Sequence, residues 1–313
     1  MLKQVKKIPL FLLCLLLLCS AGCGAPKETS APAESATAVT FTDALGTTVT
    51  VDQPQTVVAC MGGLADIWLL AGGQESLAGI ADDADFTVPD HVTKIGAHDA
   101  PSPESILALN PDFVILSAAT AQQTALDATL TQAGIPHAYF DINSFADYLN
   151  TLELFSQITG HPESYQKYGV AVQEDIEATI AETQNQTPPT VLLLITYSQG
   201  VRAQTSDTMT GAMLKDLGCV NLADENPSLL QTFSVEAIVE MDPDFILVIP
   251  MGYSKDAAAE SLTAYLESNP AWAGLSAVQT GGYHVLDPSL FQYKPNDQWS
   301  KSYDKLAEIL YGQ

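Results

Sequence analysis

One short segment of this chain occurs twice, and this repeat constrains the fold more than any other feature. Residues 102–115 read SPESILALNPDFVI and residues 234–247 read SVEAIVEMDPDFIL, 132 positions apart, with six of fourteen positions identical. Each copy holds a Ser that can cap a helix, an acidic residue two positions later, a short apolar helix, a Pro-Asp turn and a strand that begins with Phe. A fainter pair, LLAGGQESLAG around Gly73 and LKDLGCVNLAD around Gly218, occurs in the same order and predicts a helix ending in Gly before a short strand. The sequence therefore predicts an internal duplication and two equivalent lobes.

Apolar runs alternate with helical patterns in both predicted lobes, which is typical of an α/β fold. Between the lobes, apolar residues recur at helical spacing from Pro162 to about Thr183. Such a helix is about 33 Å long, so we expect one stiff connection that permits little movement of the lobes. The predicted strands are Val57 to Ala59, Phe113 to Leu116, Ala138 to Phe140, Val191 to Ile195, Phe245 to Ile249 and His284 to Leu286. The predicted boundaries are 40–143 for the N-terminal lobe, 144–186 for the connecting helical segment and 187–313 for the C-terminal lobe.

The N-terminus has the pattern of a secretory signal. Lys3, Lys6 and Lys7 precede an apolar run from Ile8 to Leu18, which is too short to span a bilayer. The run ends in Ser-Ala-Gly before Cys23, which resembles a bacterial lipoprotein signal with Cys23 as the acylated first residue of the mature chain. We expect residues 1–22 to be removed and residues 23–39, rich in Ala, Pro, Ser and Thr, to form a flexible tether. An ordinary signal peptide with an incidental Cys is the alternative.

The predicted lobes are strongly acidic. Removal of residues 1–22 takes away three Lys and no acidic residue, which leaves 9 basic and 37 acidic residues, a net charge of 9 − 37 = −28. This charge excludes nucleic acid as a partner and favours solubility or attraction to a basic surface. Only Cys60 and Cys219 remain beyond the signal and Cys23, one in each lobe. Because a disulfide between the lobes would lock any cleft, we expect two free, mostly buried thiols.

These features together resemble a known family. The lipoprotein signal, the opening segment FTDALGTTVTVDQPQTVVAC, the GLADIWLLAG helix, the repeated Glu segment, the single connecting helix and the closing NPAWAGLSAVQTGGYHVLD look like the solute-binding proteins of ABC importers for ferric siderophores, haem and cobalamin. The resemblance implies two Rossmann-like lobes joined by one long backbone helix, with the ligand cleft between the lobes. It further implies a monomeric, lipid-anchored receptor on the extracytoplasmic face of the cell membrane, which captures an iron chelate, haem or a corrinoid and delivers it to a permease dimer with its ATPase. It implies no cofactor of its own, since iron or cobalt would belong to the transported ligand.

One Glu in each copy of the repeat is a candidate for docking to the permease. In the family that the chain resembles, an acidic residue on each lobe docks into arginine pockets of the permease, and the motif carries this role to Glu104 and Glu236. The alternative is local, because a Glu in the first turn of a helix is stabilised by the helix dipole without any partner.

The ligand is expected where loops leave the carboxyl ends of the strands. Arg202 is the only arginine of the chain and suits a carboxylate, such as a haem propionate, although pairing with a surface acid is the alternative. His98 lies in a loop from which some haem-binding relatives draw an axial ligand, and Met61 and Tyr293 could also ligate iron or line the pocket. The expected ligand-binding residues are Arg202, Met61, His98, Tyr197, Tyr253 and Tyr293. The expected loops are Cys60 to Leu64, Gly96 to Ser102, Ser117 to Ala121, Thr196 to Thr210, Pro250 to Ser254 and Pro288 to Asn296.

Two other classes of protein remain open at this point. An extracytoplasmic enzyme is disfavoured because the sequence holds no Gly-x-Ser-x-Gly, His-Glu-x-x-His, phosphate-loop or Cys-x-x-Cys motif. A receptor for Zn or Mn would need about three His and a carboxylate in the cleft. The five His are scattered, and His91 and His161 fall in turns away from the predicted cleft loops.

Overall fold

The computed structural model describes residues 37–197, 200–226, 235–251, 260, 264 and 268–312. The chain divides into two compact units, Met1–Ser35 and Ala36–Gln313, and all described residues belong to the second. The predicted signal, Cys23 and most of the tether lie outside the described residues, as do Ser234 and Tyr253.

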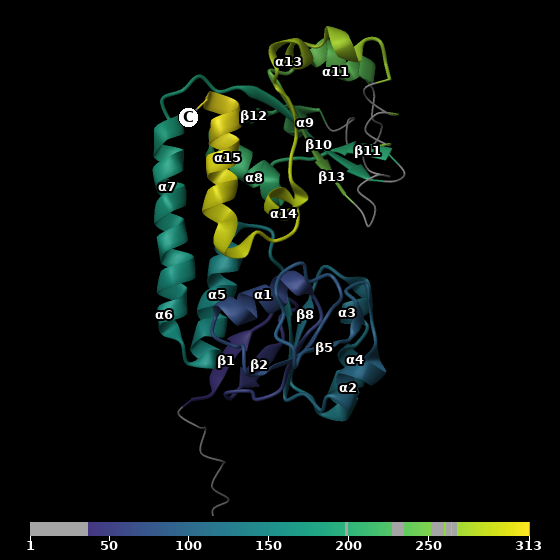
Figure 1. Cartoon of the computed structure of the whole chain (residues 1–313), viewed down its shortest axis with the longest axis vertical. Helices are drawn as coiled ribbons and strands as arrows, with labels where there is room; N and C mark the ends of the chain where they lie inside the picture. Colours follow the sequence, from purple (N-terminus) through teal and green to yellow (C-terminus); the bar gives the residue numbers. More distant parts are fainter. Residues whose placement is uncertain are drawn as a thin grey trace, which may run out of the picture. The chain divides into compact units, whose positions relative to one another are not determined.

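The first half of the second unit is built on a parallel sheet of five strands, in the order β5-β4-β3-β8-β9 (Figure 1). Alternate residues of its strands face opposite sides, so Val57 and Phe113 pack against α1 and α5 while Val58 and Val114 face α2 and α4. An antiparallel hairpin, β1–β2, precedes the sheet. The elements are β1 (Val39–Thr42), β2 (Thr48–Val51), β3 (Val57–Ala59), α1 (Gly62–Leu70), β4 (Leu77–Ile80), β5 (Thr93–Lys94), β6 (Gly96–Ala97), β7 (Ala100–Pro101), α2 (Pro103–Ala108), β8 (Phe113–Ser117), α3 (Ala121–Thr124), α4 (Asp127–Ala133) and β9 (His137–Phe140).

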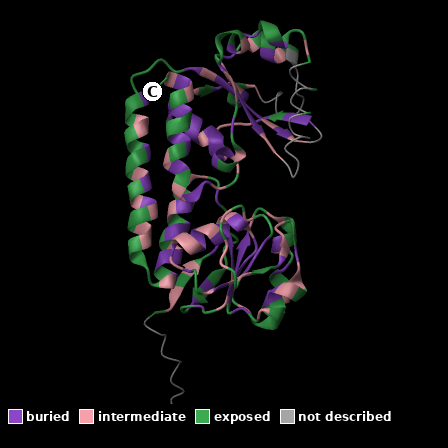
Figure 2. Ribbon diagram, viewed as in Figure 1, coloured by how far each residue is buried: buried purple, intermediate pink, exposed green. Residues whose placement is uncertain are grey.

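The second half repeats this plan around another five-stranded sheet, β11-β10-β13-β14, in which β12 also pairs with β10. Val191 and Leu247 face α8 and α15, and Leu192 and Ile246 face α11 and α13. The strands of both sheets are the most deeply buried parts (Figure 2). The elements are β10 (Thr190–Tyr197), β11 (Gly200–Ala203), α8 (Met209–Asp216), β12 (Val220–Asn221), α9 (Leu222–Glu225), α11 (Val235–Met241), β13 (Phe245–Pro250), η3 (Trp272–Gly274), α13 (Ser276–Thr280), β14 (Tyr283–Val285), α14 (Pro288–Phe291), η4 (Asn296–Gln298) and α15 (Trp299–Tyr311).

The predicted strands are all present, and the α/β fold is confirmed. The described residues of the duplicated segment form a corresponding helix, turn and strand in both halves. Asn110 and Asp242, at the same motif position, both adopt left-handed φ angles of 47° and 40°, a conformation that Asn and Asp tolerate best among residues with a side chain. Two positions on, Asp112 accepts hydrogen bonds from the N–H groups of residues 55 and 56, and Asp244 accepts one from the N–H of Thr190. Each carboxylate thus ties the segment to the start of the neighbouring central strand.

The two halves are connected along the chain by helices. α5 (Phe145–Thr159) ends at Gly160, and α6 (Pro162–Tyr165) leads through a π-helical turn (Gln166–Val170) into α7 (Ala171–Thr183). The predicted helix from Pro162 to Thr183 is therefore present, but it contains a π turn that the apolar spacing did not indicate. Inside this turn the carbonyl of Tyr168 accepts a hydrogen bond of 2.8 Å from the Tyr148 hydroxyl of α5. α15 lies alongside α7 (Figure 1), where Thr179 donates a hydrogen bond of 2.6 Å to Asp304.

Side chains make a second connection that the sequence analysis missed. The segment after α14 returns to the first half, where Lys294 donates a hydrogen bond to the carbonyl of Ile142. Asn296 donates to the carbonyl of Gly63 at 3.0 Å and to the Asp66 carboxylate at 2.6 Å. We call Lys294, Asn296, Asp66 and Ile142 the junction. Apolar side chains of α1, α5, α7, α8 and α15 also pack into one continuous core that includes residues of both halves.

Two local expectations need correction. The expected loop from Thr196 to Thr210 contains strand β11, which pairs antiparallel with β10, because Val201 and Ala203 are buried while Arg202 between them is exposed. The helix-ending glycine of the first half is Gly72, with φ 93°, rather than Gly73. Gly73 is needed for close packing, since a Cβ there would lie 2.0 Å from Nε1 of Trp68.

Candidate functional site

Three loops of the first half meet at the carboxyl ends of β3 and β8, and one buried amide joins them. Gln123 of α3 is fully buried and donates hydrogen bonds of 2.8 Å to the carbonyls of Cys60 and His98. Its side-chain oxygen accepts a hydrogen bond of 2.7 Å from the N–H of Ser117. Cys60, His98 and Ser117 belong to the three loops that the sequence analysis expected to bind ligand in this half. Gln123 itself was missed.

Asp83 lies between the segment that follows Met61 and the loop that carries His98. The Asp83 carboxylate accepts a hydrogen bond of 3.0 Å from the N–H of Gly62, the residue after Met61. Its second oxygen lies 3.7 Å from Nδ1 of His98, too far for a hydrogen bond. Nδ1 is buried and has no hydrogen-bond partner among the described residues, while about a third of the His98 side chain, 32%, is exposed. The exposed part of the ring is therefore the part away from Nδ1.

Tyr293 approaches the same region from the second half. It is 46% exposed and precedes Lys294, whose side chain lies against Gly63, since a Cβ on Gly63 would be 3.1 Å from Cβ and Cγ of Lys294. Burial lowers the pKa of Lys294, and the nearby carboxylates of Asp141 and Asp147 oppose this shift. Met61, His98 and Tyr293 thus belong to neighbouring segments, which are held by Asp83 and the junction.

Tyr197 and Arg202 form a separate pair on the β10–β11 hairpin. The guanidinium carbon of Arg202 lies 5.2 Å from the centroid of the Tyr197 ring, a cation–π distance that fixes the direction of the arginine side chain. No carboxylate of the described residues forms an ion pair with Arg202. Thr196, at the same end of β10, is buried and its hydroxyl has no hydrogen-bond partner within the described part of the chain.

The two thiols are free, as predicted. Burial raises the pKa of Cys60 to about 12 and that of Cys219 to about 11, so both stay protonated and unreactive at neutral pH. Among the described residues, no three His, Cys, Asp or Glu side chains are grouped to hold a metal ion.

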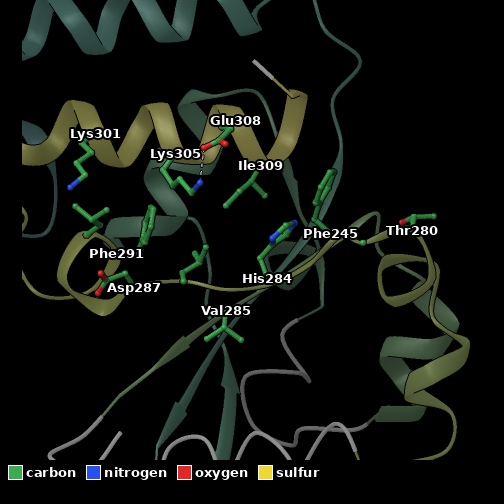
Figure 3. Close-up of a pocket in the computed structure, with 14 residues that line it drawn as sticks. Phe245, Thr280, His284, Val285, Asp287, Phe291, Lys301, Lys305, Glu308 and Ile309 are labelled. Atoms are coloured by element: carbon green, nitrogen blue, oxygen red, sulfur yellow. Dashed lines mark hydrogen bonds and ion pairs between the residues drawn. The ribbon is translucent and has the colours of Figure 1, made fainter.

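A cavity of the second half lies apart from these residues. It has a volume of about 910 Å³ and runs along β14, between this strand and α15 (Figure 3). His284 stacks on Phe245 at one end, with ring centroids 6.5 Å apart, and Lys305 is neutralised by Glu308 at 2.6 Å. Of the expected ligand-binding residues that the structure describes, none lines this cavity or one of about 260 Å³ beside the β1–β2 hairpin.

The two docking candidates occupy equivalent places. Glu104 and Glu236 lie in the first turns of α2 and α11, and both are exposed. The expected N-cap of α2 is present, since the Ser102 side chain accepts a hydrogen bond of 3.1 Å from the N–H of Ser105. Ser102 also donates to the Glu104 carboxylate at 3.3 Å, so Glu104 has a local hydrogen-bond partner.

The residues that the sequence analysis missed are polar side chains that act on backbone groups. Gln123, Asp83 and Asn296 bond to carbonyls and N–H groups far away in sequence. The amino-acid composition of a segment does not indicate such long-range hydrogen bonds. The one local hint is Asn296, whose left-handed φ of 51° is compatible with its place after Pro295 at the start of η4.

Comparison with known proteins defines the class. The sequence profile of the family described as periplasmic binding protein matches residues 57–290. The chain belongs to this family, whose members bind solutes and are not enzymes. The expectation that the protein is not an enzyme is confirmed by this membership. Within the part of the chain that the structure describes, every helix is too short or too polar to cross a membrane.

Individual relatives agree with the family. The iron-uptake system-binding protein of Bacillus subtilis (strain 168) is 27% identical over 304 residues, which cover 91% of this chain and 92% of that protein. The periplasmic haem-binding protein RhuT of Roseiflexus sp. RS-1 in its apo form has a TM-score of 0.68 at 22% identity, over 82% of this chain and 98% of that one. SirA of Staphylococcus aureus, complexed with staphyloferrin B, has a TM-score of 0.67 at 19% identity, over 88% and 97%. At these identities the two structures establish the fold alone.

Proposed function

We propose that this chain is the extracytoplasmic substrate-binding protein of an ABC importer for iron, and that it captures a ferric siderophore or haem and passes it to the permease and its ATPase. The observation that carries the proposal is the relation to an iron-uptake binding protein over 91% of the chain. The grouping of candidate ligand residues at the carboxyl ends of two equivalent sheets supports it. A corrinoid belongs to the same proposal as a third ligand class, and a Zn or Mn ion is the alternative.

The ligand would bind between two lobes, residues 40–143 and 187–313, with 144–186 as the connector. His98 would face the metal through Nε2, with Nδ1 on the side of the Asp83 carboxylate, 3.7 Å away. Arg202, aligned by Tyr197, would bind a carboxylate of the ligand. Met61 and Tyr293 would line the iron side of the cleft. Tyr253, a further candidate for ligand binding, lies outside the described residues.

Ligand titration tests this proposal. The purified protein is titrated with haemin and, separately, with ferric complexes of catecholate, hydroxamate and citrate-type chelators, and binding is followed by tryptophan fluorescence and visible absorption. We expect one of these probes to bind, and Arg202→Ala to weaken a carboxylate-bearing probe by about 10- to 100-fold, as expected for one charged hydrogen bond. For a probe that binds through its metal, His98→Ala should change the absorption spectrum. His161→Ala, which removes an exposed His paired with Glu163 at 3.0 Å, is the matched control. Absence of binding by every iron probe, together with binding of Zn²⁺ or Mn²⁺, would favour the alternative.

Docking and anchoring complete the proposal. Glu104 and Glu236 would contact basic residues of the permease, one in each of its two equivalent halves. Cys23 would carry the lipid that keeps the protein at the membrane, so Cys23→Ala should release a folded protein from the membrane fraction of its host. A variant that still sediments with membranes would count against the anchor.

A further inference from the structure

The duplicated helices share a feature beyond their acidic residue. Ile106 of α2 and Ile238 of α11, at the same motif position, are both fully buried and anchor their helices to the sheets. The next residues, Leu107 and Val239, are exposed to nearly the same extent, 38% and 39%. Both helices lie on the sheet faces turned away from the continuous core that α7 and α15 share, and both carry exposed residues (Figure 2).

Exposed aliphatic side chains are common singly, so one of them would need no explanation. Here two of the six large apolar side chains that the described residues expose occupy equivalent positions of the repeat. The others lie outside the repeated segment: Leu45, Val220, Val285 and Tyr293. An isolated helix would tolerate a polar residue at either exposed position. Both copies of the repeat nevertheless have an aliphatic side chain there.

Each exposed aliphatic side chain lies three positions after the Glu of its helix. Residues three apart lie on the same face of a helix, so Glu104 with Leu107, and Glu236 with Val239, present a carboxylate and an apolar group side by side. The pairs are 132 residues apart in sequence and have the same relation to their sheets. A partner that binds both pairs in the same way must itself have two equivalent surfaces.

We propose that Leu107 and Val239 are part of the permease-docking surface, and that each equivalent half of the permease offers a basic side chain beside an apolar depression. This proposal rests on the docking role given above to Glu104 and Glu236. Charge favours this partner over a second copy of the chain, because two copies would each bring a formal charge of −25 and the same Glu side chains.

The apolar contacts would respond to salt differently from the ion pairs. An exposed ion pair contributes little and is screened by salt, whereas burial of an aliphatic side chain is not weakened in this way.

Binding to the permease at two salt concentrations tests the proposal. The cognate permease–ATPase complex is reconstituted in nanodiscs, and the affinity of the purified protein is measured by biolayer interferometry at low and high NaCl. We expect Leu107→Ser/Val239→Ser to bind about tenfold more weakly at both concentrations. Glu104→Gln/Glu236→Gln should bind more weakly at low salt and lose most of its salt dependence. Leu45→Ser/Val220→Ser, which removes two apolar side chains that are 52% and 40% exposed and lie outside residues 102–115 and 234–247, is the control.

The outcomes separate the two proposals. Wild-type affinity of Leu107→Ser/Val239→Ser would overturn the apolar contact, while a defect confined to Glu104→Gln/Glu236→Gln would leave the acidic docking intact. Weaker binding of the apolar variant with no effect of the Glu variant would support this inference and remove the Glu residues from the interface. A loss shared by Leu45→Ser/Val220→Ser would overturn the inference as well, since it would reflect a general apolar effect. Melting temperatures of all variants, and the milder Leu107→Ala/Val239→Ala, exclude misfolding as the cause.

Discussion

At the scale of single residues, the arrangement of the candidate site depends on buried polar groups that satisfy backbone atoms. Gln123 uses both ends of its amide to hold Cys60, His98 and Ser117. A buried donor or acceptor that loses its partner costs about 1–3 kcal/mol. Gln123 therefore determines where three loops can lie, although it need not touch a ligand.

Replacement of Gln123 should be costly. We expect Gln123→Ala to lower the free energy of unfolding by about 3 kcal/mol or more, because it leaves two carbonyls and one N–H without partners and opens a cavity. Urea denaturation measures the change. Gln122→Ala, a change at the exposed neighbouring residue, is the control and should have little effect. A loss below about 1 kcal/mol for Gln123→Ala would mean that water replaces the amide.

The sequence indicates residue roles only where a role follows from local pattern. Spacing and residue type indicate that Ser102 caps α2, that a glycine ends α1 and that Trp68 and Trp299 are buried. Gln123 could not, because it stands in a polar run, AQQT, in which nothing distinguishes it from Gln122. Its role comes from contacts made up to 63 residues away.

At the scale of elements, the duplicated unit was predictable because all of its signals are local. The cap, the apolar helix, the left-handed Asn110 or Asp242 and the Pro-Asp turn each act within a few residues. The π turn at Gln166–Val170 was not predictable, because apolar spacing is the same on both sides of it. A Cβ on Gly169 would lie 3.1 Å from the side chains of Leu149 in α5 and of Tyr165. α5 therefore packs closely on the π turn.

The hydroxyl of Tyr148 should stabilise this turn. Burial raises the pKa of Tyr148 above its usual range, so the hydroxyl stays protonated and donates to the carbonyl of Tyr168. We expect Tyr148→Phe to lower the free energy of unfolding by about 1 kcal/mol, measured by urea denaturation. Tyr165→Phe removes a partly exposed hydroxyl nearby and serves as the control. Equal stability of Tyr148→Phe and wild type would show that this hydrogen bond contributes nothing.

At the scale of the whole second unit, the halves are joined by one passage of the chain and by the junction. The single passage was foreseen from the helical pattern before Pro188. The junction was not, because Asn296 and Gly63 are 233 residues apart and their contact has no sequence signature. Burial raises the pKa of Asp66 in the junction, and the hydrogen bond from Asn296 only partly opposes this shift.

This buried carboxylate gives the junction a defined pH dependence. Because the pKa of Asp66 is higher in the folded chain, the ionised form costs stability at neutral pH, and the cost disappears as the pH falls to the ordinary carboxyl value near ~4. Asp66→Asn keeps an acceptor for Asn296 and removes the charge. We expect a higher melting temperature than wild type at pH 7, and a difference that shrinks below about pH 4. Glu75→Gln, which removes an exposed carboxylate, should not show this pattern. A lower melting temperature of Asp66→Asn at pH 7 would mean that the ionised pair stabilises the junction.

The return of the chain from α14 to the first half also constrains the order of folding. The first parallel sheet can assemble from residues before Pro162, but the hydrogen bonds of Asn296 and Lys294 and the packing of α15 on α7 close loops of 125 to 233 residues. Such distant contacts form late, because the entropy of loop closure must be lost before they contribute. The first half therefore gains its hydrogen bonds from Lys294 and Asn296 late in folding. Until then the carbonyl groups of Gly63 and Ile142 lack these partners. The segment before α15 is therefore the last to connect the two halves.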